Sequence, residues 1–196
     1  TITLLRSEAK SLGLWNLYLP DKEWGAGVSN HDYSLLCEHM GRSAAAPRVF
    51  NCQAPDTGNA EILAEFGTDA QNAKWLTPLL EGEIRSCFSM TEPDTSGADP
   101  TGIRTHAVKD GDEYVINGHK WFTSGAVGAE FAIAMVVTNP EGNPHERASM
   151  LIVPTSTPGF NLIRSVPVMG HTGGGGHCEI QYKLNPGVLV GTISID

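Results

Sequence analysis

Glycine is distributed unevenly along this chain of 196 residues. Residues 1–90 contain seven of the 22 glycines, and residues 91–196 contain fifteen. Because glycine weakens helices and supplies turns, the first part is expected to be helical and the second to consist of short strands. Helices followed by strands indicate an α+β fold and not a doubly wound parallel sheet. We predict a helical domain over 1–85 and a small antiparallel β-barrel over 86–196.

Apolar residues at helical spacing mark four helices in the first part. One is expected over residues 2–12, and a second begins after Ser29. Two more are expected within residues 57–81, the last of them beginning after Thr68. Serine and threonine are frequent N-cap residues, which supports these starting points. The last two helices are predicted to pack closely against each other.

Short apolar runs separated by turn residues characterise the second part. Asp110 and Gly111 form the strongest short-range hairpin signal in the chain, and Asn117 with Gly118 is expected to form another turn. Strands are expected at 87–90, 103–109, 112–117, 131–138, 150–153, 160–165 and 178–182. This spacing is typical of a small barrel or sandwich.

Charge and composition exclude several classes of partner. The chain has 22 acidic and 13 basic side chains and a formal net charge of −9. Nucleic acid and anionic membranes need a basic face, so neither is expected as a partner. An apolar content of 40% and a mean hydropathy of −0.15 are typical of a soluble globular protein. We expect no signal peptide, and the scattered cysteines are expected to be free thiols in a reducing compartment.

Two segments have the composition of a ligand-binding surface. In residues 88–105 a strand ends in a loop rich in Gly, Ser, Thr and Asp, whose backbone N–H groups could cradle an anion. In residues 114–126, Trp121 and Phe122 precede two hydroxyl residues and could pack on a planar ring. An ordinary surface loop and ordinary barrel core are the respective alternatives. No GxGxxG follows a strand, so a Rossmann site is not supported.

A third segment, GHTGGGGHC at 170–178, contains His171, His177 and Cys178. Their spacing matches no standard zinc signature. We therefore expect no metal here, and we expect the glycines to form a loop near a binding site.

Taken together and in this order, these segments resemble the acyl-CoA dehydrogenase superfamily. The resemblance spans nearly the whole chain, and its motifs are LTPLLEG at 76–82, MTEP at 90–93, GIRT at 102–105, NGHKWFTSGA at 117–126 and LIVPTSTPG at 151–159. The APDTGN run at 54–59 and GHTGGGGHCEI at 170–180 are similar to the branch whose animal members carry an extra kinase-like domain.

The resemblance implies an FAD-dependent oxidoreductase of fatty acid metabolism. Such an enzyme removes the α-proton of an acyl-CoA thioester, transfers hydride from the β-carbon to flavin N5, and passes electrons to an electron-transfer flavoprotein. It implies a homodimer or homotetramer with a third domain, a C-terminal four-helix bundle that bears the catalytic carboxylate and is expected to be absent from this chain. We therefore name no catalytic residue.

The resemblance also implies which residues bind the cofactor. They are Phe88, Met90, Thr91, Ser96, Gly97, Ala98, Phe122, Thr123 and Ser124. Thr91 would bond the isoalloxazine edge, Phe122 would flank the ring where the family usually has Trp, and Thr123 or Ser124 would direct a hydroxyl at N5 and O4. Ala98, which is also implied in substrate binding, replaces the usual serine and leaves Ser96 as the nearby hydroxyl.

Two other functions stay open at this point. One is a truncated, catalytically inactive module that binds acyl-CoA or a nucleotide, and the other is a flavin oxidase-type relative on the same fold. The expected compartment is the cytoplasm in a bacterium and the mitochondrion or peroxisome in a eukaryote.

Overall fold

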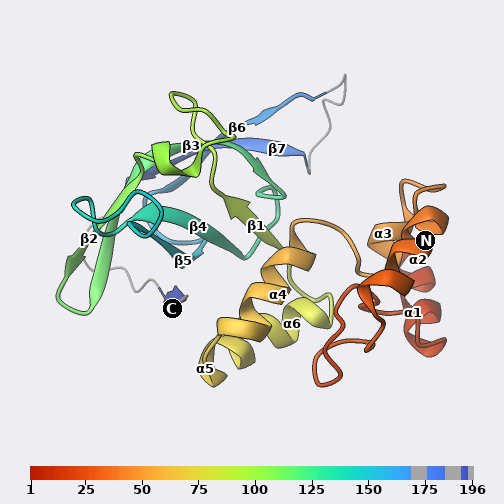
Figure 1. Cartoon of the computed structure of the whole chain (residues 1–196). Helices are drawn as coiled ribbons and strands as arrows, with labels where there is room; N and C mark the ends of the chain where they lie inside the picture. Colours follow the sequence, from red (N-terminus) through yellow and green to blue (C-terminus); the bar gives the residue numbers. More distant parts are fainter. Residues whose placement is uncertain (169–175, 184–190, 194–196) are drawn as a thin grey trace. The chain divides into compact units, whose positions relative to one another are not determined.

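The computed structural model describes residues 1–168, 176–183 and 191–193. The chain divides into two compact units, Thr1–Glu83 and Ile84–Asp196. Helices make up the first unit and strands dominate the second (Figure 1), which confirms the α+β prediction. No helix within the described ranges has the length and apolar character needed to cross a membrane.

The first unit is a set of short helices. They are α1 (Ile2–Ser11), α2 (Asn30–Met40), α3 (Ala46–Val49), α4 (Asp56–Phe66), α5 (Asp69–Gln71), η1 (Asn72–Leu76) and α6 (Thr77–Leu80). Both predicted caps are present. Ser29 accepts a hydrogen bond from the backbone of Asp32, and Thr68 forms a reciprocal capping box with Gln71. Helix α3 was not predicted, because four residues are too few to show helical periodicity.

The predicted helix after Thr68 is interrupted. Instead of one continuous α-helix, the structure has α5, a π-helical turn at η1, and α6. The cause is Pro78, which has no N–H to donate and whose ring clashes with the carbonyl of the preceding turn. The widened turn lies directly before it. As predicted, α4 packs against this segment, through η1 and α6.

Buried asparagines fix the end of α6. The backbones of Asn16 and Asn51 are in the left-handed region, with φ of 54° and 55°, which asparagine tolerates better than most residues. Asn51 Nδ2 donates to Asn16 Oδ1 at 2.8 Å, and Asn16 Nδ2 donates to the carbonyl of Leu80 at 3.0 Å. Trp15 Nε1 donates to the same carbonyl at 2.7 Å. A terminal helix carbonyl is thereby satisfied without water.

The second unit is one mixed sheet. Its strands are β1 (Ser86–Ser89), β2 (His106–Asp110), β3 (Glu113–Ser124), β4 (Phe131–Val137), β5 (Ala148–Pro154), β6 (Phe160–Val166), β7 (His177–Lys183) and β8 (Gly191–Ile193). The order is β6-β7-β3-β1-β4-β5-β8, and β2 pairs with both β3 and β4. The pairings therefore form a closed circuit through β3, β1, β4 and β2, as a small barrel requires.

The sheet differs from the predicted barrel in its strand directions. Both β1 and β2 run parallel to β4, while the other pairs are antiparallel. Its core is lined by buried apolar side chains, among them Ile116, Leu151, Ile180 and Tyr182. Among the described residues of this unit the only helical element is the short 3₁₀ turn η2 (Pro100–Gly102).

The two turn predictions had opposite outcomes. The β2–β3 hairpin is present: Asp110 ends β2 and pairs with Glu113, and the turn consists of Gly111, with a φ of 63°, and Asp112. The predicted turn at Asn117 and Gly118 is wrong, because both residues lie inside β3. Gly118 is needed there for close packing, since a Cβ at this position would lie 2.3 Å from Oγ1 of Thr105. The strand prediction also missed β8.

Candidate functional site

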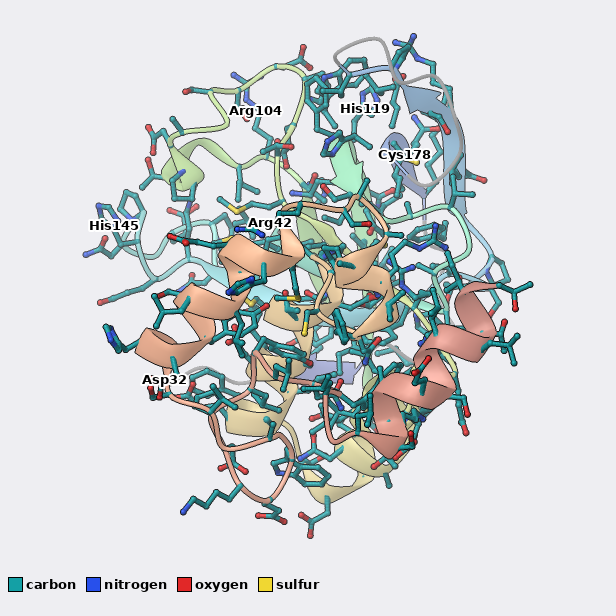
Figure 2. All side chains as sticks on the ribbon, turned by 90° about the vertical axis from the view of Figure 1, so that its right-hand side faces the viewer. Asp32, Arg42, Arg104, His119, His145 and Cys178 are labelled. Atoms are coloured by element: carbon teal, nitrogen blue, oxygen red, sulfur yellow. The ribbon has the colours of Figure 1, made fainter. Side chains whose placement is uncertain are left out.

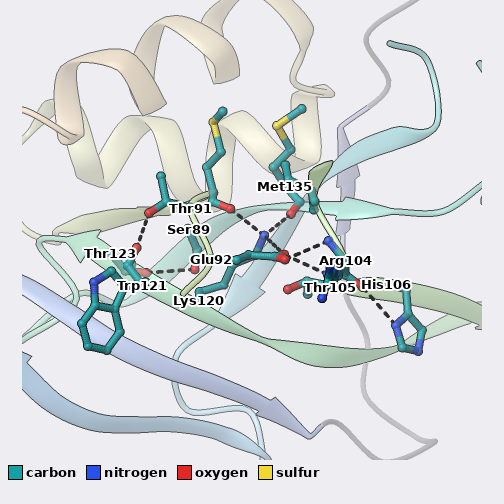
Figure 3. Close-up of polar contacts among 12 residues, drawn as sticks. Ser89, Thr91, Glu92, Arg104, Thr105, His106, Lys120, Trp121, Thr123 and Met135 are labelled. Carbon is teal, nitrogen blue, oxygen red and sulfur yellow. Dashed lines mark hydrogen bonds and ion pairs between the residues drawn. The ribbon is translucent and has the colours of Figure 1, made fainter. Parts of the chain in front are cut away.

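The two segments singled out by the sequence meet where β1 pairs with the end of β3. Phe88 is the register partner of Ser124. Next to this pair, Ser89 Oγ lies 3.2 Å from Thr123 Oγ1, and both side chains are fully buried. Figure 3 shows these hydroxyls beside the buried contacts of the neighbouring loop. The pairing therefore fixes the MTEP loop against the WFTS segment.

Thr91 and Trp121 continue this junction beyond β1. The backbone N–H of Trp121 donates to the carbonyl of Thr91 at 2.8 Å, and the Thr91 hydroxyl donates to the carbonyl of Trp121. Gly97 folds back onto Thr91, where a Cβ would lie 3.2 Å from Cγ2 of the threonine. Ser96 and Ala98 are exposed on the same loop. The loop thus presents backbone and small side chains to solvent from a fixed base.

A β-bulge reorients Phe122. The register between β3 and β7 shifts between Lys120 and Thr123, and Phe122 within this interval has a φ of 54°. A left-handed conformation is unusual for a bulky residue, and bulges next to functional sites often redirect a side chain. The phenylalanine ring is 44% exposed and meets the ring of Trp121 edge-on at 5.4 Å. The bulge therefore places an aromatic face in solvent beside a hydroxyl-rich strand end.

Trp121 is held from its other side by β6 and β7. The guanidinium of Arg164 lies 5.2 Å from the centre of the Trp121 ring, and its Nε donates to Glu179 at 2.6 Å. His119 contacts the second carboxylate oxygen of Glu179 at 2.8 Å. The hydrogen bond from Arg164 holds the pKa of Glu179 below its ordinary value. This network fixes the aromatic pair that includes Phe122.

Ser124 is also held by a side chain. Its Oγ lies 2.8 Å from Nδ1 of His177 on β7, and the imidazole meets Phe122 edge-on at 5.9 Å. From the sequence, His177 was considered only as a possible metal ligand and was not paired with Ser124. The register of β3 against β7 creates this contact, and no local sequence signal points to it.

An ion pair between Lys120 and Glu92 lies next to the β1–β3 junction (Figure 3). Their side chains are 0% and 5% exposed, and Nζ lies 3.0 Å from Oε1. Lys120 also donates to the carbonyls of Met90 and Met135, each at 2.8 Å. Burial lowers the pKa of Lys120 to about 8, although the carboxylate of Glu92 acts in the opposite direction. Lys120 was not among the residues predicted from the sequence.

The carboxylate of Glu92 is fully engaged. It accepts hydrogen bonds from the backbone N–H groups of Arg104 and Thr105, both at 2.8 Å, as well as from Lys120. Burial acts to raise the pKa of Glu92, but the hydrogen bonds from Thr105 and the charge of Lys120 lower it overall. These bonds hold the carboxylate between β3 and the backbone at Arg104 and Thr105, which is a structural role.

The outcome for the predicted site residues is mixed. The β1–β3 junction brings together Phe88, Met90, Thr91, Phe122, Thr123 and Ser124. Of these, Thr123 is buried and bonded to Ser89, so its hydroxyl faces the interior. Ser96, Gly97 and Ala98 lie on the adjoining exposed loop. The roles of these residues toward a cofactor, and of Ala98 toward substrate, stay predictions.

Metal ligands do not gather in the described ranges. No group of three or more His, Cys, Asp or Glu side chains there could hold a metal ion, and Figure 2 shows His145 lying apart from His119 and Cys178. His171 lies outside the described residues. None of the four cysteines forms a disulfide, in agreement with the prediction of free thiols.

A surface pocket of about 220 Å³ is lined in part by Glu92 of the ion pair. It is lined by Glu92, Pro93, Asp94, Arg104, Thr105, His106, Asn117, Gly118 and His119. None of the predicted cofactor-binding residues lines it. The aromatic ring and hydroxyls at the β1–β3 junction are therefore not part of this pocket.

Comparison with known proteins identifies the family. Sequence models of two domain families match the chain: the acyl-CoA dehydrogenase N-terminal domain over residues 3–83 and the acyl-CoA dehydrogenase middle domain over residues 87–184. Together these matches cover most of both structural units.

Individual relatives point to the same family as the two domain models. FadE2 of Mycobacterium tuberculosis, named as an acyl-CoA dehydrogenase, is 49% identical over 181 residues, which are 91% of this chain and 44% of that protein. Acyl-CoA dehydrogenase family member 11 of Homo sapiens is 47% identical over 187 residues, 93% of this chain and 24% of that protein. A solved Mycobacterium abscessus structure, described as an acyl-CoA dehydrogenase, has a TM-score of 0.90 at 46% identity.

The superposition with that structure covers 93% of this chain and 46% of the other, so the chain spans less than half the length of these relatives. Within that span both units match, one to each family domain. The chain therefore belongs to the acyl-CoA dehydrogenase family, a family of oxidoreductases.

Proposed function

We propose that this chain forms the FAD- and acyl-CoA-binding portion of an acyl-CoA dehydrogenase that oxidises the α,β-bond of an acyl-CoA thioester. The observation that carries the proposal is the β1–β3 junction. It places the loop after Phe88 beside the exposed ring of Phe122 and the hydroxyl of Ser124. Flavin-dependent dehydrogenation is the reaction of the family to which the chain belongs.

The residues at this junction fit a flavin. A planar, largely apolar ring with a polar edge needs an aromatic wall and a few fixed hydrogen-bonding groups. Phe122 supplies the wall, because the bulge turns its ring to solvent. Ser124 supplies a hydroxyl at the strand end, and the Thr91 oxygen lies on the neighbouring loop. The exposed loop through Gly97 offers backbone N–H groups to the pyrophosphate.

Each of these groups has a definite task in the reaction. Bound FAD would supply the hydride acceptor at its N5 atom. A fixed hydroxyl beside N5 and O4 stabilises the charge that grows there without reorganising, which is the task we assign to Ser124. Phe122 excludes water and orients the ring. We assign no catalytic base in this chain, since the carboxylate of Glu92 already has three donors.

The partners follow from the same proposal. The substrate would be an acyl-CoA, the electron acceptor an electron-transfer flavoprotein, and the assembly a homodimer or homotetramer. Ala98 lies on the exposed loop, where a methyl group takes the place of the hydroxyl that we expected from the family resemblance. Ser96 on the same loop is the residue we propose to replace that hydroxyl.

Flavin content tests the proposal directly. We expect the protein at its natural length to be purified with a visible flavin absorbance that bleaches when an acyl-CoA is added under anaerobic conditions. Phe122→Ala should weaken FAD binding, whereas Val108→Ala, which also removes an exposed apolar side chain from this unit, should not. A protein that binds no FAD and reduces no dye with any acyl-CoA would exclude the enzyme function.

A binding module without catalysis is the second candidate. It is favoured by Ala98 in the exposed loop, because alanine lacks the hydroxyl of the serine that the family usually has at this position. Titration of the purified protein with acyl-CoA and, separately, with FAD distinguishes the two functions. Tight acyl-CoA binding without FAD binding would favour the module, and FAD binding followed by reduction of the flavin would favour the dehydrogenase.

A further inference from the structure

One histidine on β7 contacts both of the β3 residues that we propose to face the flavin. His177 is the register partner of Ser124 across the β3–β7 pair. Its Nδ1 lies 2.8 Å from the Ser124 oxygen, and its ring meets Phe122 with centroids 5.9 Å apart and planes at 77°. A single side chain thus touches the hydroxyl and the aromatic wall together.

The backbone around His177 is held on both sides. On β6 it pairs with Val166, and beside it the N–H of Gly125 donates to the carbonyl of Gly176 at 3.1 Å. The imidazole itself is only half-buried. It therefore occupies a fixed place at the edge of the proposed flavin surface without being part of the barrel core.

The hydrogen bond to His177 limits what Ser124 can offer a ligand. A serine hydroxyl has one hydrogen and two lone pairs and rotates freely when it has no partner. Once the hydrogen or one lone pair of the hydroxyl is bonded to Nδ1, the other hydrogen-bonding directions of the oxygen are fixed. Which atom donates depends on the imidazole tautomer, but in either case the hydroxyl no longer rotates at random. A group fixed in advance stabilises developing charge better than a mobile one.

We infer that His177 is a positioning residue of the flavin site, which fixes the hydroxyl of Ser124 and the ring of Phe122 against the isoalloxazine ring. This inference rests on the proposed function. It assigns His177 no contact with the substrate and no proton transfer, since it acts through its two neighbours.

Two substitutions separate the two contacts of His177. His177→Phe keeps an aromatic ring beside Phe122 but has no nitrogen for Ser124. His177→Asn loses the ring but keeps a polar atom near the position of Nδ1. Each is made with and without Ser124→Ala, and His106→Phe, which alters an exposed histidine on β2, is the control. The readouts are the Kd for FAD added to the apoprotein at its natural length and the visible spectrum of the bound flavin.

We expect His177→Phe to raise the Kd for FAD about three- to tenfold, the effect of one hydrogen bond, and to shift the flavin absorbance bands. In the Ser124→Ala background the same substitution should change the Kd less than about twofold, because its partner is already gone. His177→Asn should recover most of the affinity, and His106→Phe should leave it unchanged.

An equal loss of affinity in both backgrounds would overturn the inference, since it would mean that His177 merely supports the β7 edge. An unchanged Kd for FAD in either His177→Phe or Ser124→Ala would also overturn the inference. A wild-type protein that binds no FAD would instead overturn the proposed function, and with it the inference, so the two failures are distinguishable.

Discussion

Lys120 and Glu92 form an ion pair that is almost completely removed from solvent, with 3.0 Å between Nζ and Oε1. Lys120 lies on β3, and Glu92 lies in the loop that follows β1. The two remaining donors of the ammonium go to the carbonyls of Met90 and Met135. The pair therefore ties the MTEP loop to β3 and β4, next to the residues proposed to face the flavin.

Removal of the lysine should destabilise the protein strongly. Lys120→Met leaves a buried carboxylate without its cation and removes the ammonium that donates to the carbonyls of Met90 and Met135. Breaking a buried pair by removing one partner lowers the free energy of unfolding by about 3–5 kcal/mol, and urea denaturation measures it. The matched control is Lys109→Met on the exposed face of β2, which should change the free energy of unfolding by less than about 0.5 kcal/mol. Equal effects of the two substitutions would contradict the role given to the pair.

The same lysine should make stability depend on alkaline pH. Burial lowers its pKa from 10.5 to about 8 in the folded chain. Between these values the unfolded chain still holds a proton that the folded chain has released, so the free energy of unfolding rises with pH. We expect the free energy of unfolding of the wild-type protein, minus that of Lys120→Met, to rise by on the order of 1 kcal/mol per pH unit above pH 8. Denaturation of both proteins at several pH values checks this, and parallel curves would refute it.

Local signals predicted those parts of the fold that depend on neighbouring residues. The helix starts after Ser29 and Thr68 were correct because a cap needs only the next three residues. The Asp110-Gly111 hairpin was correct for the same reason. The order of the motifs also predicted one cofactor site for the segments around Thr91 and Phe122. The structure places the two segments next to each other through β1 and β3, and the cofactor site itself stays a prediction.

Features that depend on distant residues could not be predicted. Lys120 reads as an ordinary strand lysine, and its burial follows from acceptors 30, 28 and 15 residues away in sequence. Asn117 and Gly118 have the composition of a turn, and only the packing of Thr105 against Gly118 shows why a strand residue there must be glycine. The contact between His177 and Ser124 likewise needs the β3–β7 register.

Gly118 offers a test of that packing. Gly118→Ala would place a methyl group 2.3 Å from Oγ1 and 2.5 Å from Cβ of Thr105. Because Thr105 is itself buried, the strand must shift, and we expect a loss of about 1–3 kcal/mol in the free energy of unfolding. At Gly102 the added Cβ would lie 3.7 Å from Thr95, an ordinary contact. Gly102→Ala is therefore the control, and thermal or urea denaturation should separate the two variants.

The bulge at Phe122 predicts an unusual order of stabilities. Its φ of 54° is a conformation that costs a residue with a Cβ about 1–2 kcal/mol and costs glycine nothing. Alanine normally stabilises a strand more than glycine does. At this position we expect the reverse, with Phe122→Gly more stable than Phe122→Ala by about 1 kcal/mol in urea denaturation. Both variants should lose affinity for FAD, since each removes the exposed ring. A more stable alanine variant would contradict the energetic cost assigned here to the left-handed conformation at this position.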